Sequence, residues 1–206
     1  PTPMPSQNLE NSDFNGKYSW SKAPRYMDFA AEAGPLSRVI MAGNPANLEH
    51  QNQDPLFLDI MDKLGPSVFT RTLARLHEAP RLYNYIDEWL RQIDLNGEFY
   101  IKPEERDGKG WGATEAARGA LAHWVEIKNG VIENYQVMAP TTWNVGPNDE
   151  KNNPGPIEAA LEGTEIEDPH DPVEVGMVAR SFDSCLVCTV HAHDNKTGEQ
   201  LAKFKL

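Results

Sequence analysis

The sequence predicts an α+β protein in which helix predominates. Apolar residues recur every three or four positions between Val68 and Ile93, which is the spacing of an amphipathic helix. Further along, Asn129-Gly130 separates two alternating runs, and this arrangement is a strong signal for a β-hairpin. The 16 prolines and 15 glycines among 206 residues indicate many short elements joined by turns, with no clear domain boundary.

The first helix is expected to begin at Pro55 and to stop at Gly65. Proline is tolerated at the first helical position, and the aspartate before it is a good N-cap residue. The apolar series over residues 68–93 is interrupted by Pro80, which removes one hydrogen bond of a helix. We therefore expect either two helices or one kinked helix in this part of the chain.

The remaining elements are shorter. Residues 156–161, closed by Gly163, predict another helix, and the acidic, proline-broken residues 164–174 predict a loop. After a turn at residues 195–198, the tail alternates apolar residues with lysines, as a half-exposed strand does. Residues 1–16 read as an irregular lead-in.

Composition excludes several classes of protein. The net charge of −12 argues against a nucleic-acid partner, because such a surface needs Lys and Arg to neutralise phosphates. No run approaches the roughly 18 consecutive apolar residues that span a bilayer. The beginning of the chain lacks the charged and apolar regions of a signal peptide. A chain that begins at Pro1 is expected to be processed, truncated or one piece of something larger.

The two cysteines form the pattern Cys185-x-x-Cys188, followed by His191. This spacing suits a metal or redox pair better than a structural disulfide. The pair supplies two ligands, whereas a tetrahedral structural zinc needs four, and a thioredoxin-like site would start a helix after a strand. A pair of buried free cysteines and half of a metal site completed by another chain both remain open on spacing alone.

Two other runs could carry chemistry. Glycines flank the short segment 112–119, which ends in Arg118-Gly119 and could let backbone approach something closely; a surface arginine is the ordinary alternative. The run 139–144 is rigid and bears hydroxyl groups. It is either an ordinary turn against a core tryptophan or the wall of a pocket.

Several of these runs stand together in the order of motifs of one family. They are KYSWSKAPRY (17–26), EAGPLSR (32–38), GATEAARGALAHW (112–124), IENYQVMAPTTWNVGPND (132–149) and VARSFDSCLVCTVH (178–191). Through them the chain closely resembles the carboxy-terminal part of the large subunit of nickel–iron hydrogenases. The resemblance implies the carboxy-terminal part of that fold over residues 17–191, followed by an extension over residues 192–206.

The resemblance implies a set of metal ligands. Cys185 matches a terminal nickel thiolate, and Cys188 matches a thiolate that bridges nickel and an iron bearing cyanide and carbonyl ligands. Soft thiolates suit both metals. His191 matches a ligand of a magnesium or similar hard ion, with the backbone carbonyl of Val137 as a second ligand.

The resemblance also implies the surroundings of the metals. Arg118 matches a fixed cation over the open metal position, and Asp183 matches its carboxylate partner; an arginine side chain stays protonated and is a poor base. Ala117, Pro140 and Thr141 match the pocket around the diatomic ligands of iron. The family often has proline at two positions where this chain has Ala117 and Ser184.

The implied function is a component of a hydrogenase that cleaves H2 heterolytically, or evolves it. Electrons would leave through iron–sulfur clusters on a small subunit. The family's first C-x-x-C motif and its glutamate proton relay are absent, so we expect a fragment or one half of a split large subunit, completed by an amino-terminal part. Alternatives are a non-catalytic precursor and a metal-free scaffold like the quinone-site subunit of respiratory complex I.

Further partners and a location follow from the same resemblance. A membrane cytochrome or quinone-linked acceptor and a maturation protease are expected, on the periplasmic side of the cytoplasmic membrane, with a cytoplasmic enzyme as the alternative. In the family, the chain is cut after the histidine that matches His191. The extension over residues 192–206 is therefore either a maturation peptide or a retained, docked strand.

Overall fold

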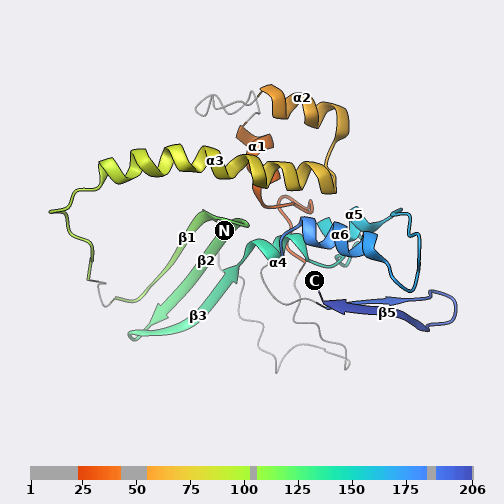
Figure 1. Cartoon of the computed structure of the whole chain (residues 1–206). Helices are drawn as coiled ribbons and strands as arrows, with labels where there is room; N and C mark the ends of the chain where they lie inside the picture. The colour runs from red at the N-terminus through yellow and green to blue at the C-terminus, as the bar shows by residue number, and fades with distance from the viewer. Residues whose placement is uncertain (1–22, 43–54, 103–105, 185–188, 206) are drawn as a thin grey trace.

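The computed structural model describes residues 23–42, 55–102, 106–184 and 189–205. In these ranges three helices are followed by three strands, three further helices and two strands, and helices take the larger share of the residues (Figure 1). The strands form two separate antiparallel sheets, one of three strands and one of two. This arrangement confirms the predicted α+β class with helix predominating. The predicted lead-in, residues 1–16, lies outside the described ranges.

Three helices form one layer of the molecule: α1 (Pro35–Ala42), α2 (Pro55–Leu64) and α3 (Val68–Gln92). The bounds of α2 confirm the prediction. Of the two alternatives for residues 68–93, the structure shows one helix, which continues through Pro80. Ser67 caps α3 with a capping box, in which the side chains of Ser67 and Thr70 satisfy each other's backbone N–H groups.

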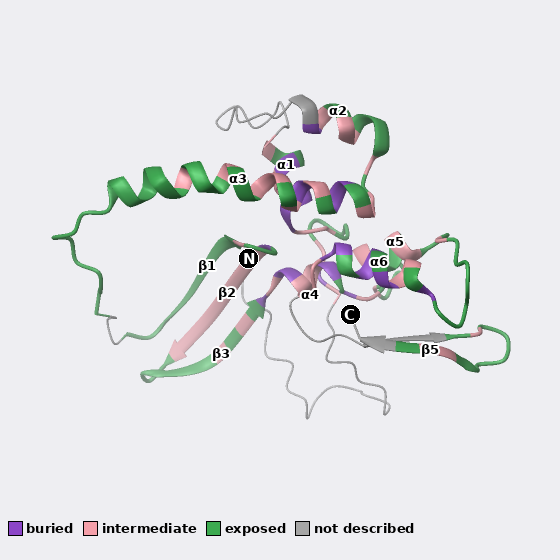
Figure 2. Ribbon diagram, in the orientation of Figure 1, coloured by how far each residue is buried: buried purple, intermediate pink, exposed green. Residues whose placement is uncertain are grey.

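A small apolar core joins these helices. Leu36 and Val39 of α1, Phe57 of α2 and Ala74 of α3 are buried together. Figure 2 shows buried residues where α1 meets the first half of α3, and again around α4 and α6. The second half of α3 is exposed, so it extends away from the core of the described chain.

The larger sheet is formed by β1 (Gly108–Ala116), β2 (Gly119–Lys128) and β3 (Val131–Met138), in that spatial order. Asn129 (φ 53°) and Gly130 (φ 73°) both have positive φ, as a type I′ hairpin turn requires, so the predicted hairpin is confirmed. Strand β1 was not predicted from the sequence. Its glycines are depleted in strands, and pairing with β2 overrides that preference.

Three short helices follow the sheet: α4 (Pro140–Asn144), α5 (Pro156–Leu161) and α6 (Val173–Ser181). The predicted helix 156–161 is confirmed as α5. The loop predicted over residues 164–174 is two residues too long. The chain becomes helical directly after Pro172, whose ring restricts φ to a helix-compatible value.

The smaller sheet pairs β4 (Thr189–His193) with β5 (Gln200–Lys205). The connecting turn is stabilised by the Asp194 carboxylate, which accepts hydrogen bonds from the backbone N–H groups of Lys196 and Thr197. This confirms the predicted turn and the predicted strand in the tail. Among the described residues, no helix has the length and apolar character needed to cross a membrane.

Candidate functional site

The predicted metal ligands lie at the edge of what the structure describes. Cys185 and Cys188 are outside the described residues. The backbone of His191 lies within β4, where it pairs with Lys203 of β5. Elsewhere in the described ranges, no group of three or more His, Cys, Asp or Glu side chains could hold a metal ion. The described part of the site is therefore the segment before Cys185 and the residues that contact this segment.

Arg118 and Asp183 are brought together from distant parts of the chain. Arg118 lies in the turn between β1 and β2, and Asp183 lies just beyond α6. The Arg118 Nε and the Asp183 Oδ1 are 3.4 Å apart, and both side chains are partly exposed. Asp183 adopts φ 54°, a left-handed conformation that aspartate tolerates better than most residues. The predicted pair is thus an ion pair two residues before Cys185.

A second arginine, Arg75 of α3, contacts the same carboxylate. Its Nε lies 3.3 Å from the Asp183 Oδ2, and its Nη2 donates a 3.1 Å hydrogen bond to the Ser181 carbonyl. Asp183 therefore lies between two guanidinium groups. Arg75 could not be predicted as a site residue from local sequence, because its partners are more than a hundred positions away along the chain.

Arg71, one turn earlier on α3, contacts Phe182, the residue before Asp183. The buried Arg71 guanidinium makes a two-pronged ion pair with Glu32, with both N···O distances at 2.9 Å. It also lies over the Phe182 ring, 3.9 Å from the ring centre. Residues four apart lie on one helix face, so Arg71 and Arg75 together hold the segment 181–183.

Arg38 of α1 holds the turn that carries Arg118. It pairs with both carboxylate oxygens of Glu78, at 2.6 and 2.7 Å, and with Glu115 at 2.8 Å. It also donates to the carbonyls of Ala116 and Ala117. Partial burial lowers the pKa of Arg38, but the hydrogen bonds to Glu78 and Glu115 outweigh this effect and raise the pKa overall. A cation with five acceptors is a rigid link between two helices and the sheet.

The turn between β1 and β2 packs closely against the loop before α1. Gly119 has φ 130°, and a Cβ at this position would lie 2.7 Å from the Gly34 nitrogen and 2.8 Å from the Ala33 Cβ. Both the conformation and the space require glycine here. This close backbone contact fixes where the preceding residue, Arg118, leaves the sheet.

Helix α4 places Pro140 and Thr141 beside this region. Pro140 is buried and Thr141 is half-buried. The buried Asn144 side chain donates to the carbonyls of Ala33 (2.8 Å) and Phe182 (3.4 Å), and it accepts from the Ala33 N–H. These bonds tie α4 to the loop before α1 and to the segment before Cys185.

Val137, the predicted backbone ligand, lies in β3 opposite His123. Its carbonyl accepts a 2.9 Å hydrogen bond from the Gln136 side chain. A carbonyl oxygen has two lone pairs, so this bond leaves room for one more partner.

The hydroxyl of Ser184 is the described polar group nearest in sequence to Cys185. Its oxygen is buried and has no hydrogen-bond partner among the described residues. A buried polar group without a partner requires an explanation. The orphaned hydroxyl fits a site that is completed by a group or a chain segment beyond those described.

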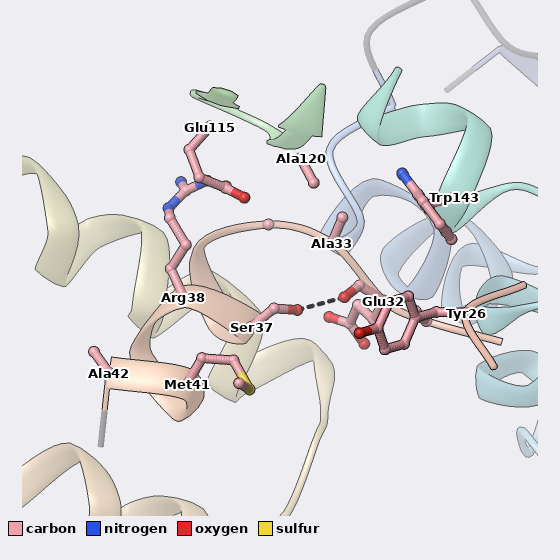
Figure 3. Close-up of a pocket in the computed structure, with 12 residues that line it drawn as sticks. Tyr26, Glu32, Ala33, Ser37, Arg38, Met41, Ala42, Glu115, Ala120 and Trp143 are labelled. Carbon is pink, nitrogen blue, oxygen red and sulfur yellow. Dashed lines mark hydrogen bonds and ion pairs between the residues drawn. The ribbon is translucent and has the colours of Figure 1, made fainter. Parts of the chain in front are cut away.

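A separate cavity of about 550 Å³ is lined by the loop before α1, by α1 itself and by Ala120 of β2 (Figure 3). Its wall is mostly apolar and includes Trp143 of α4 and Tyr26, with the Arg38–Glu115 ion pair at one side. None of the predicted site residues whose side chains the structure describes lines it. Trp143 is therefore a cavity wall and not a fully buried core residue.

A model of the nickel-dependent hydrogenase family matches residues 3–191, and the chain belongs to this family. The predicted resemblance is thereby confirmed.

Individual relatives agree. The chain is 41% identical over 198 residues to the uptake hydrogenase large subunit of Rhodobacter capsulatus, which covers 89% of this chain and 33% of the relative. It is 40% identical over 201 residues to the periplasmic NiFeSe hydrogenase large subunit of Desulfomicrobium baculatum, covering 92% and 38%. A solved structure of the NiFeSe hydrogenase from Desulfomicrobium baculatum superposes with a TM-score of 0.73 at 39% identity, over 85% of this chain and 37% of that one. The chain spans about a third of the length of its curated relatives.

Proposed function

We propose that this chain is the carboxy-terminal part of the large subunit of a nickel–iron hydrogenase, which cleaves H2 heterolytically or evolves it. The Arg118–Asp183 ion pair carries the proposal, because it places a fixed cation and its carboxylate two residues before Cys185. Membership in a nickel-dependent hydrogenase family supports the same assignment.

The residues of the second motif fit one half of a thiolate-held centre. Cys185 would hold nickel, and Cys188 would be shared between nickel and iron, since both metals accept soft thiolate ligands. His191 and the Val137 carbonyl would hold a magnesium or similar hard ion. When bound, the centre supplies the site at which H2 is polarised and its electrons are taken up.

The iron in this proposal carries cyanide and carbonyl ligands. Ala117, Pro140 and Thr141 would form the pocket around them, with the Thr141 hydroxyl as a hydrogen-bond donor. Pro140 is rigid, and the Asn144 side chain ties α4 to the segment before Cys185. The pocket wall and the ligand segment are thus fixed relative to each other.

The side chains of this chain then have distinct tasks. The Arg118 guanidinium stays protonated, so it orients and polarises H2 but does not accept its proton. Asp183 holds that cation in place. The thiolate sulfur of Cys185 would accept the proton, which leaves the charge of the Arg118–Asp183 pair unchanged during turnover.

We further propose the partners that complete the enzyme. The rest of the large subunit would supply the first C-x-x-C motif, and a small subunit would carry iron–sulfur clusters. A membrane cytochrome or quinone-linked acceptor would receive the electrons, and a maturation protease would process the chain. Because one relative is a periplasmic enzyme and another belongs to an uptake hydrogenase, we place the complex on the periplasmic side of the membrane.

Metal analysis of the assembled complex tests the proposal. We expect nickel and iron together with H2 oxidation, and loss of nickel and activity in both Cys185→Ser and Cys188→Ser, because each change removes a primary ligand. A stable complex without nickel or iron would refute the proposal and favour the metal-free scaffold. Full nickel and normal turnover in either variant would remove that cysteine from the ligand set.

A further inference from the structure

We propose that Arg75 is a positioning residue that orients the Asp183 carboxylate and, through it, Arg118. This inference rests on the proposed function, because it assigns Arg75 a task at the same site. Its basis is that the two oxygens of one carboxylate have different cationic partners. The Asp183 Oδ1 is paired with Arg118 at 3.4 Å, and the Oδ2 is paired with Arg75 at 3.3 Å.

The two arginines differ in how firmly they are held. Arg118 lies in a turn and its side chain is 47% exposed, so its guanidinium has room to move. Arg75 projects from the first half of α3 and its side chain is 34% exposed. Its Nε is buried and makes the ion pair with Asp183 without a hydrogen bond, and its Nη2 donates a hydrogen bond to the Ser181 carbonyl. Arg75 is therefore the partner of Asp183 with the additional anchor, because its Nη2 is also bonded to the backbone of the segment that carries Asp183.

The neighbouring contacts restrict the same segment. Arg71 packs on the Phe182 ring, and Arg75 contacts the Ser181 carbonyl and the Asp183 carboxylate. One face of α3 therefore contacts three consecutive residues, 181 to 183. Rotation of an aspartate carboxylate about its last bond is otherwise soft, because that torsion has broad minima. With the Oδ2 held by Arg75, the Oδ1 stays directed at Arg118. Arg75 thus acts on the reaction through a carboxylate, without contact with the reacting atoms.

The test uses the complete hydrogenase complex with Arg75→Gln, Asp183→Asn and the double variant. Arg91→Gln is the matched control, because Arg91 is an exposed residue of the same helix that pairs only one turn back, with Asp87. We expect Arg75→Gln to keep its nickel and iron and to lower kcat about 10- to 100-fold, the scale of an ångström-sized misplacement. The KM for the electron acceptor should not change.

Two further readouts separate positioning from a merely structural role. Because Arg75 acts through Asp183, the double variant should be no slower than Asp183→Asn alone, whereas independent effects would multiply. A crystal structure of the Arg75→Gln complex should show the Asp183 carboxylate rotated away from Arg118. Arg75→Lys keeps the charge but has a single nitrogen for both the Asp183 carboxylate and the Ser181 carbonyl, so it should recover only part of the turnover.

The outcomes are distinct. Turnover in Arg75→Gln equal to that of Arg91→Gln, or fully multiplicative effects in the double variant, would overturn the proposal. Loss of assembly or of metal in Arg75→Gln, with an unmoved carboxylate in Arg75→Lys, would also overturn it and leave Arg75 a structural residue. A parent complex without nickel and without H2 oxidation would instead refute the proposed function, and the carboxylate orientation would still be measurable.

Discussion

Arg118 shows at the scale of one residue why shape matters as well as charge. Its guanidinium is a planar fork that can face Asp183 and the open side of the site at once, whereas a lysine ammonium is a compact point charge. We expect Arg118→Lys to retain nickel and iron and to lose about 10²-fold or more in kcat, as removal of one oriented donor does elsewhere.

H2-oxidation kinetics with metal analysis check this prediction. Arg180→Lys, at an exposed position of α6, is the matched control and should behave like the parent. An Arg118→Lys enzyme as fast as the parent would remove Arg118 from the catalytic residues.

The Asp149 carboxylate makes the stability of its loop depend on pH. The backbone N–H of Asn153 contributes most to lowering the pKa of this carboxyl from 3.8 to about 2, followed by the Asn153 amide, the Lys151 N–H and Arg25; partial burial opposes them. Because the pKa is depressed in the folded chain, the ionised form stabilises the loop. That contribution is complete above about pH 3.8 and is lost as the pH falls through about 2.

Hydrogen exchange of the backbone amides in residues 147–153 measures this effect in the assembled complex. Asp149→Asn should lower the protection of these amides, and the difference from the parent should be constant from neutral pH to about pH 4. It should then shrink steadily as the pH approaches about 2. A difference that persists undiminished at that acidity would contradict the assignment of the stabilisation to the carboxylate.

The site residues divide into those that the sequence could predict and those that it could not. Cys185, Arg118 and Asp183 stand in runs whose local order is informative. Arg71 and Arg75 stand in a helix whose apolar spacing gives no hint of distant partners. Their roles depend on Phe182 and Asp183 packing against α3, which is a tertiary fact.

The turn between β1 and β2 depends on Gly119, which lies against the loop before α1. Gly119→Ala forces a Cβ into the backbone of the loop before α1 and strains a positive φ. We expect a loss of about 1–3 kcal/mol in stability, together with slower H2 oxidation because Arg118 is displaced.

Thermal melting of the complex and kinetics provide the measurement. Gly112→Ala is the matched control, since that glycine of β1 has open space around its Cβ position and should change stability by no more than about 0.5 kcal/mol. Equal melting temperatures of the two variants would show that the close contact between the turn and the loop is not required.

The elements themselves were predictable where local signals agree with the tertiary structure. Helices α2 and α5 have proline at the start, and the β2–β3 hairpin has Asn-Gly at its turn. Strand β1 and helix α6 have no such signal. Glycines at alternate positions weaken the strand pattern of β1, and Gly176 lies in the middle of α6, so both depend on neighbouring elements.

At the scale of the whole molecule, the described residues expose far more apolar side chains than they bury. Eight hydrophobic residues form the buried set, whereas 27 large hydrophobic residues are exposed. The second half of α3 and its C-cap residue present Leu82, Ile86, Trp89, Leu90 and Ile93 at helical spacing. Soluble monomers rarely expose continuous apolar stripes of this kind. The stripe therefore agrees with the proposal that other parts of a hydrogenase complex cover it.

The tail gives the final prediction, and it concerns the assembled enzyme. Strand β5 lies within residues 192–206 and pairs with β4, the strand that contains His191. The family match ends at the same histidine. While the tail is attached, the backbone of His191 is paired with Lys203 and is held in an extended strand. A two-stranded sheet is only marginally stable by itself, so removal of β5 would release the segment.

We therefore expect the chain in active complex to end at His191, with nickel bound. Intact mass and nickel content of the complex from nickel-supplied cells measure this, and complex from nickel-starved cells is the control, in which the tail should remain. Cleavage would free the backbone N–H and C=O groups of His191 from β5 and let this residue turn toward the hard ion. A full-length chain with stoichiometric nickel and H2 oxidation would contradict the prediction and make the β4–β5 sheet part of the working enzyme.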